Sequence, residues 1–165
     1  MTHPLVTQLR FARSELMRGL EGLTAEEAEH RFMPMNSISW MVGHLANQEH
    51  SYWLRLAQAK NIAPDLNKMV GYGKPASTPP WDEILKTWEK VTTATDEYLD
   101  TITAAVLDQH FAWRDKEWRE DIGTLLLRII FHYWYHIGEI QAVRQNHGHT
   151  NLPDFVGDDM GRVRY

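Results

Sequence analysis

The sequence of 165 residues contains no cysteine. This absence excludes a disulfide framework, a thiolate metal site and a cysteine nucleophile, and it fits a reducing compartment. The net charge is only −5, and acidic and basic residues are interspersed, so nucleic acid is a poor partner. No apolar stretch approaches the roughly 18 residues that a membrane helix needs, and the N-terminus lacks a basic segment followed by an apolar run. We therefore expect a cytoplasmic protein with neither a membrane nor a nucleic acid as partner.

Hydrophobic residues make up 43% of the sequence and aromatic residues 11%. A chain of this length can bury most of its unfolded surface in a single core. The sequence therefore predicts one globular domain over residues 1–165. Its unusual feature is the presence of nine histidines, because histidine is the commonest metal ligand.

Apolar residues recur at helical spacing in four long stretches, which capping and helix-breaking residues delimit. A shorter helix is predicted from Thr24 toward Phe32, where acidic residues favour a helix N-terminus. The four long helices are predicted over residues 5–20, 36–60, 78–105 and 121–145.

The segments between these helices carry weaker signals. Residues 61–80 hold four prolines and two glycines, which predicts a long loop that crosses the bundle. Residues 107–120 fit irregular or short extended structure. The C-terminal tail is expected to lie over the bundle through Leu152, Phe155 and Val156. Four long helices, one crossover loop and no convincing strand together predict an all-α four-helix bundle with a short extra helix.

The sequence FHYWYHIGE places His132 and His136 four residues apart on the fourth long helix. At 100° per residue their side chains differ by about 40° around the helix axis, so both imidazoles can reach one ion. Such a pair alone is weak evidence, because two helical histidines can also be hydrogen-bonded in a core or exposed. His44 strengthens the case, since it lies in the middle of another helix.

Three neutral imidazoles leave the full charge on a bound metal ion and at least one coordination position open, which is the layout of a catalytic site. Zinc is the first choice of metal, with nickel or iron as alternatives. The competing interpretation is that all three histidines only pack the core or lie on the surface.

Helical register places other residues near this predicted centre. Trp40 and Gln48 lie one turn from His44 on the same face, and Arg128 and Glu139 share the face of the other two histidines. We expect Trp40, Gln48 and Arg128 to line a pocket that binds a cofactor. Glu139 is the candidate catalytic residue, as a general base, although it could instead orient a histidine or pair with an arginine.

The remaining candidates are assigned structural or surface roles. Glu49 lies about 140° around the helix from His44, which favours a salt-bridged or solvated side chain. His147 and His149 flank Gly148 at a helix end, where cationic side chains are favoured. Surface positions are expected for the other histidines, which are His3, His30, His50 and His110.

These features together resemble the DinB-like (DinB/YfiT) superfamily, whose members are regarded as metalloenzymes. The resemblance covers nearly the whole chain and rests on SISWMVGHLANQEHSYWL around His44, FHYWYHIGEIQAVRQ around His132 and His136, and the GHTNLPDFVGD tail. It implies an up-down-down-up bundle, often a homodimer, with a divalent metal at His44, His132 and His136.

The same resemblance implies several activities. Some relatives are thiol-dependent isomerases or transferases, in which the metal activates the thiol of a small cofactor. Because this chain lacks cysteine, such a reaction on a small-molecule substrate would need an external low-molecular-weight thiol. Apart from the resemblance, the predicted metal site leaves two alternatives open, a metal-dependent hydrolase that needs no thiol and a non-catalytic metal-binding stress-response protein.

Overall fold

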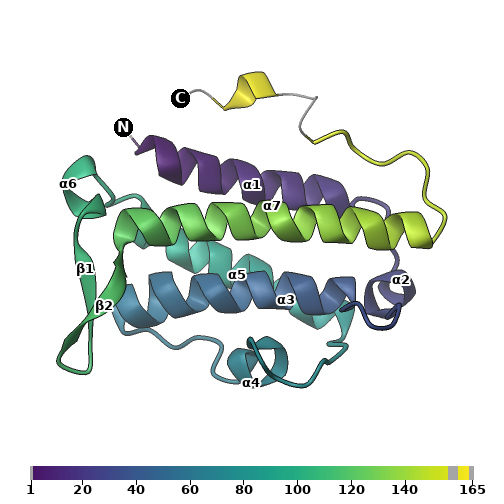
Figure 1. The fold of residues 1–165 in the computed structure, drawn as a ribbon, viewed down its shortest axis with the longest axis horizontal. Coiled ribbons are helices and arrows are strands. Elements are labelled where there is room, and N and C mark those ends of the chain that lie inside the picture. The colour runs from purple at the N-terminus through teal and green to yellow at the C-terminus, as the bar shows by residue number, and fades with distance from the viewer. Residues whose placement is uncertain (1, 156–159, 164–165) are drawn as a thin grey trace.

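The computed structural model describes residues 2–155 and 160–163, and it is mainly helical, with 62% of these described residues in helices. Four long helical segments run side by side (Figure 1). They are α1 (Pro4–Leu20), α3 (Ile38–Glu49) with its π-helical continuation η1 (His50–Leu56), α5 (Trp81–Leu99) and α7 (Ile122–Asn146). In Figure 1, α1 and α7 run in one direction, and α3 and α5 run in the opposite direction.

Local chemistry explains where the helices begin. Ser37 and Asp121 are the N-caps of α3 and α7, and their side chains accept hydrogen bonds from the N–H groups of Trp40 and Thr124. The short helix α2 (Ala25–Glu29) begins at Thr24, which forms a complete capping box with Glu27.

The crossover between η1 and α5 differs from the prediction of a loop, because it contains the helix α4 (Leu66–Val70). Its apolar side chains are too few to show a helical period, but Leu66 and Val70 are buried against the core. Packing against the core, rather than a helical pattern in the local sequence, therefore stabilises α4. Figure 1 shows α4 beside α3.

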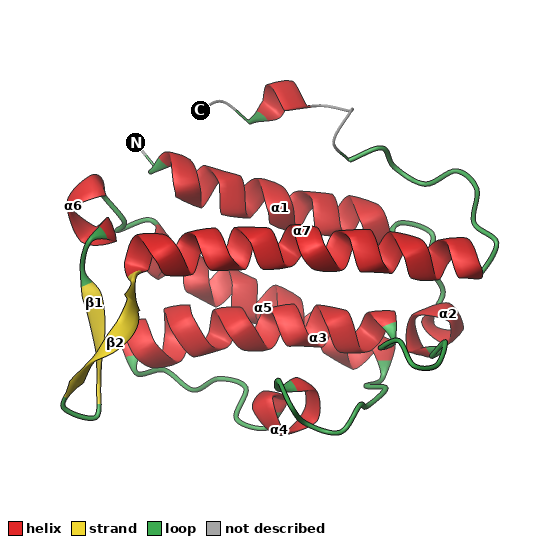
Figure 2. Cartoon of the chain, viewed as in Figure 1, coloured by secondary structure: helices red, strands yellow, loops and turns green. Residues whose placement is uncertain are grey.

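Two further predictions were wrong. α5 ends at Leu99 rather than near residue 105, and the separate helix α6 (Ala104–Leu107) follows. The prediction that no convincing strand exists is also wrong, because β1 (His110–Trp113) and β2 (Lys116–Asp121) pair as an antiparallel hairpin (Figure 2). Extended structure was one of the two alternatives predicted for this segment. After α7, the short 3-10 helix η2 (Met160–Arg162) lies near the C-terminus.

The core lies between the long helices, where α1 contacts α7, and α3 contacts both α5 and α7. The tail adds to it, since Phe155 is buried and lies beside Gly19 of α1. Val156, which was predicted to pack in the same way, lies outside the described residues.

A polar network is buried inside this core. The guanidinium of Arg13 donates to the carboxylate of Glu49, and the Tyr133 hydroxyl donates to the same carboxylate over 2.6 Å. Glu49 is thus salt-bridged, as one of its two predicted alternatives stated. His50 was predicted to lie on the surface, but it is only 2% exposed, because the crossover covers it and the N–H of Ala63 donates to its Nε2.

Candidate metal centre

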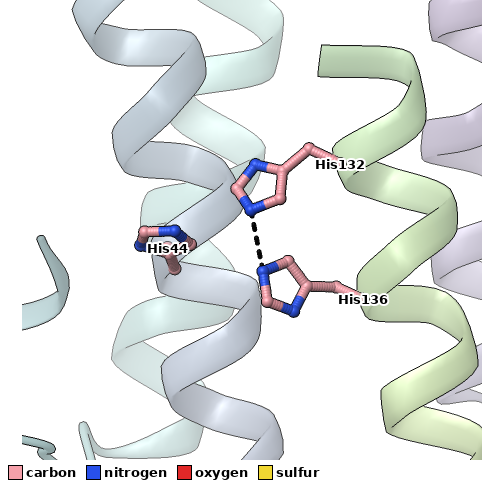
Figure 3. A group of neighbouring side chains, drawn as sticks. All are labelled: His44, His132 and His136. Atoms are coloured by element: carbon pink, nitrogen blue, oxygen red, sulfur yellow. Dashed lines mark hydrogen bonds between the residues drawn. The ribbon is translucent and has the colours of Figure 1, made fainter. Parts of the chain in front are cut away.

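His44 on α3 meets His132 and His136 on α7 where these two helices are in contact. Each ring offers one nitrogen, and the three nitrogens lie within 4.8 Å of one another. The Nε2 atoms of His132 and His136 are 2.9 Å apart (Figure 3). Among the described residues, this is the one group of three or more histidine, aspartate or glutamate side chains with metal-ligand spacing. The structure therefore brings together the three histidines that the sequence singled out.

The other ring nitrogen of each histidine faces an oxygen atom. His44 Nδ1 lies 2.7 Å from the backbone carbonyl of Val70, His132 Nδ1 lies 2.6 Å from Oε1 of Gln48, and His136 Nδ1 lies 2.6 Å from Oε2 of Glu139. A carbonyl oxygen or an ionised carboxylate can only accept, so each neutral ring carries its proton on Nδ1. The three Nε2 lone pairs are then free for a ligand bond.

Two Nε2 lone pairs that face each other over 2.9 Å repel unless a cation or a proton lies between them. Protonation of His132 is disfavoured, because burial and the neighbouring charges of His136, His44 and Arg128 lower its pKa to about 3. Burial also lowers the pKa of His44. The donor set of three nitrogens, each with a hydrogen-bonded Nδ1, therefore fits a divalent metal ion of borderline softness.

Glu139 lies behind His136 and holds its Nδ1 proton. Burial alone would raise the pKa of Glu139, but the hydrogen bond and charge of His136, together with a hydrogen bond from Tyr135, lower it. The carboxylate therefore stays ionised. This contact matches the orienting role that was an alternative for Glu139, whereas its role as general base remains a prediction.

Gln48 and Arg128 line one cleft beside the centre, whereas Trp40 is not among the residues that line it. Trp40 stacks on His44, with ring centroids 4.5 Å apart and planes inclined by 13°, and so fixes the plane of that imidazole. Gln48 contacts His132 and also lines an open cleft beside the centre. Arg128 lines the same cleft and forms a salt bridge with Glu120 of β2.

The cleft has a volume of about 790 Å³, and His44 and His132 form part of its wall. The sequence also placed parts of residues 61–80 in the pocket wall, and Asn67 and Tyr72 of this crossover do line the cleft. Further wall residues come from α3, η1 and the hairpin, and the sequence did not indicate them: Asn47, Tyr52 and Trp118. Val70 was missed for a different reason. Its backbone carbonyl accepts the hydrogen bond from His44, and a backbone group cannot be recognised from the identity of the side chain. Only the odd clustering of tryptophans near residue 118 could have drawn attention to the hairpin.

A family model described as the DinB superfamily matches residues 8–140 of this chain. The match includes all three histidines and spans most of the sequence, so the chain belongs to the DinB superfamily. No curated protein matches it. Within the described part of the chain, no helix is long and apolar enough to cross a membrane.

Proposed function

We propose that this protein binds one divalent metal ion through Nε2 of His44, His132 and His136 and is a metal-dependent enzyme. The observation that carries the proposal is the convergence of three Nε2 atoms whose Nδ1 partners are all hydrogen-bonded to oxygens. Oriented histidines of this kind are characteristic of metal sites. Zinc is our first choice, with nickel and iron as alternatives.

A divalent ion in this centre would lower the pKa of a coordinated thiol or water and stabilise negative charge. The protein's own residues orient the ligands: Val70, Gln48 and Glu139 hold the three Nδ1 protons, and Trp40 holds the plane of His44. The cleft beside His44 and His132 offers a substrate direct access to the centre.

We propose transfer or isomerisation through an external low-molecular-weight thiol as the reaction class. Family membership supports it, and the absence of cysteine means that the thiol must come from outside the chain. We also propose that the bundle has the up-down-down-up topology, which the helix directions in Figure 1 support, and that the protein acts as a homodimer in the cytoplasm.

Elemental analysis of protein purified without a histidine tag tests the metal site. We expect about one ion per chain in the native protein, and loss of that ion in His44→Ala, His132→Ala and His136→Ala variants. His30→Ala is the matched control, because His30 is exposed at the end of α2 and makes no contact with the centre. A metal content well below one ion per chain, or equal content in His136→Ala and His30→Ala, would refute the metal site.

Activity is tested with the metal-loaded protein, a panel of small thiols and 1-chloro-2,4-dinitrobenzene as a generic electrophile. We expect conjugation that needs both the metal and a thiol and that is lost in His136→Ala. Metal-dependent ester cleavage without a thiol would instead identify a hydrolase. A metal-dependent rise in melting temperature without any turnover would identify a non-catalytic metal-binding protein.

A further inference from the structure

The cleft beside the three histidines has an aromatic wall. Tyr72, Phe131 and Tyr135 line it and remain 93%, 65% and 63% exposed, although large aromatic side chains are usually at least partly buried. Tyr52 and Trp118 extend the same wall. Apolar surface gathered at one cleft is typical of a site that buries the body of an organic ligand.

A cationic side chain lines the cleft. Among the described residues that line the cleft, Arg128 is the ionised one, and aspartate and glutamate are absent. Its salt bridge to Glu120 uses Nη2, whereas a guanidinium carries five N–H donors. The Arg128 side chain is 47% exposed, so donors remain accessible from the cleft. An anion can therefore bind Arg128 in competition with Glu120.

Two buried polar atoms of the cleft residues have no hydrogen-bond partner within the described structure. They are Oδ1 of Asn47, a residue only 7% exposed, and Nε1 of Trp118. An unpaired buried acceptor or donor is costly unless a bound molecule pairs with it. Both residues line the cleft, but these two atoms lie beneath its surface, so Arg128 and the aromatic side chains are the groups that a ligand in the cleft can contact directly.

We propose that this cleft binds a small organic anion, with its anionic group on Arg128 and its apolar body against Phe131, Tyr135 and Tyr72. Arg128 lies one helical turn before His132, so a ligand held in this way extends toward the metal centre. The interpretation of this anion as a substrate rests on the proposed function. The binding itself needs only the cleft.

Calorimetric titration with benzoate at low ionic strength tests the proposal, with acetate and benzyl alcohol as probes that lack the apolar body or the charge. Benzoate should bind at least about tenfold more tightly than either. The informative variants are Arg128→Gln and Glu120→Gln, which break the same salt bridge. Arg128→Gln should weaken benzoate binding about tenfold, whereas Glu120→Gln should strengthen it about threefold, because it releases the guanidinium from an exposed pair.

Opposite effects of these two variants cannot come from a merely structural salt bridge, whose loss would change binding in the same direction for both. Each titration is made with zinc-loaded and with chelator-treated protein. Benzoate binding that persists without metal and still depends on Arg128 supports the cleft even if no metal site exists. Binding that vanishes on chelation, equal effects of the two variants, or equal affinities for benzoate and acetate would each overturn the proposal.

Discussion

Replacing Gly43 by alanine should destabilise the protein and weaken metal binding, although alanine favours helices. Gly43 precedes His44 on α3, and a Cβ built there would lie 2.7 Å from Cδ1 and 2.8 Å from Cγ1 of Ile84, and 3.1 Å from Cγ1 of Val70. Ile84 is 3% exposed and Val70 is fully buried, so neither can move freely. Val70 carries the carbonyl that orients His44.

The magnitude follows from comparison with Gly138 on α7, where an added Cβ meets no atom within 4 Å. Gly138→Ala should raise the free energy of unfolding by about 1 kcal/mol through helix propensity alone. Gly43→Ala gains the same term but costs about 1–3 kcal/mol through overpacking. Gly43→Ala should therefore lose up to about 2 kcal/mol net. The two variants should differ by about 1–3 kcal/mol, or roughly 1 M in urea midpoint.

Urea unfolding followed by circular dichroism measures the stability difference, and competition with a chelator measures zinc affinity. Gly43→Ala should lose about tenfold in zinc affinity because the Val70 carbonyl is displaced, whereas Gly138→Ala should keep native affinity. The further change Ile84→Val removes the nearest clashing atom and should recover part of the stability. Equal urea midpoints for the two glycine variants would refute this reasoning.

Three further outcomes are expected. Glu139→Gln should weaken zinc binding by about tenfold, because a neutral amide holds the His136 proton less strongly, and chelator competition measures this; unchanged affinity would contradict the orienting role. Arg13→Met should lower the free energy of unfolding by about 3–5 kcal/mol by leaving the buried Glu49 carboxylate without its cationic partner, and Arg13→Met/Glu49→Met should recover most of it in urea titrations. Hydrogen bonds from the Thr24 N–H, from His149 and from the Thr24 hydroxyl lower the pKa of Glu27 from 4.5 to about 2. The stabilisation that ionised Glu27 gives the folded protein is therefore complete above pH 4.5 and is lost as the pH falls toward 2. The urea midpoint of the native protein should drop more over this range than that of Glu27→Gln.

Much of the site could be predicted from local patterns. The spacing of His132 and His136 follows from helix geometry, and the bounds of α7 follow from the Asp121 cap and the turn at Gly148. The stacking of Trp40 on His44 likewise follows from their separation of one turn. In each case the interacting residues lie within a few positions of one another, so helical period alone relates them.

Local pattern failed where packing at long range decides the structure. The helix α4 has only five residues, which form no periodic signal, yet burial of Leu66 and Val70 holds it beside α3. His50 was assigned to the surface because helical register ignores the crossover that covers it. The hairpin alternates charged and aromatic residues without a clear period, so its strands were not resolved from sequence.

The sequence by itself determined which residues could bind a metal and which helix faces carry them, because side-chain type and helical period are local properties. Only the tertiary structure decided that α3 faces α7, that Gln48 reaches His132 from 84 positions away, and that the Val70 carbonyl orients His44. Helix faces pair through the simultaneous burial of all four long helices, and a backbone carbonyl is the same in every residue. No local pattern can therefore encode these contacts.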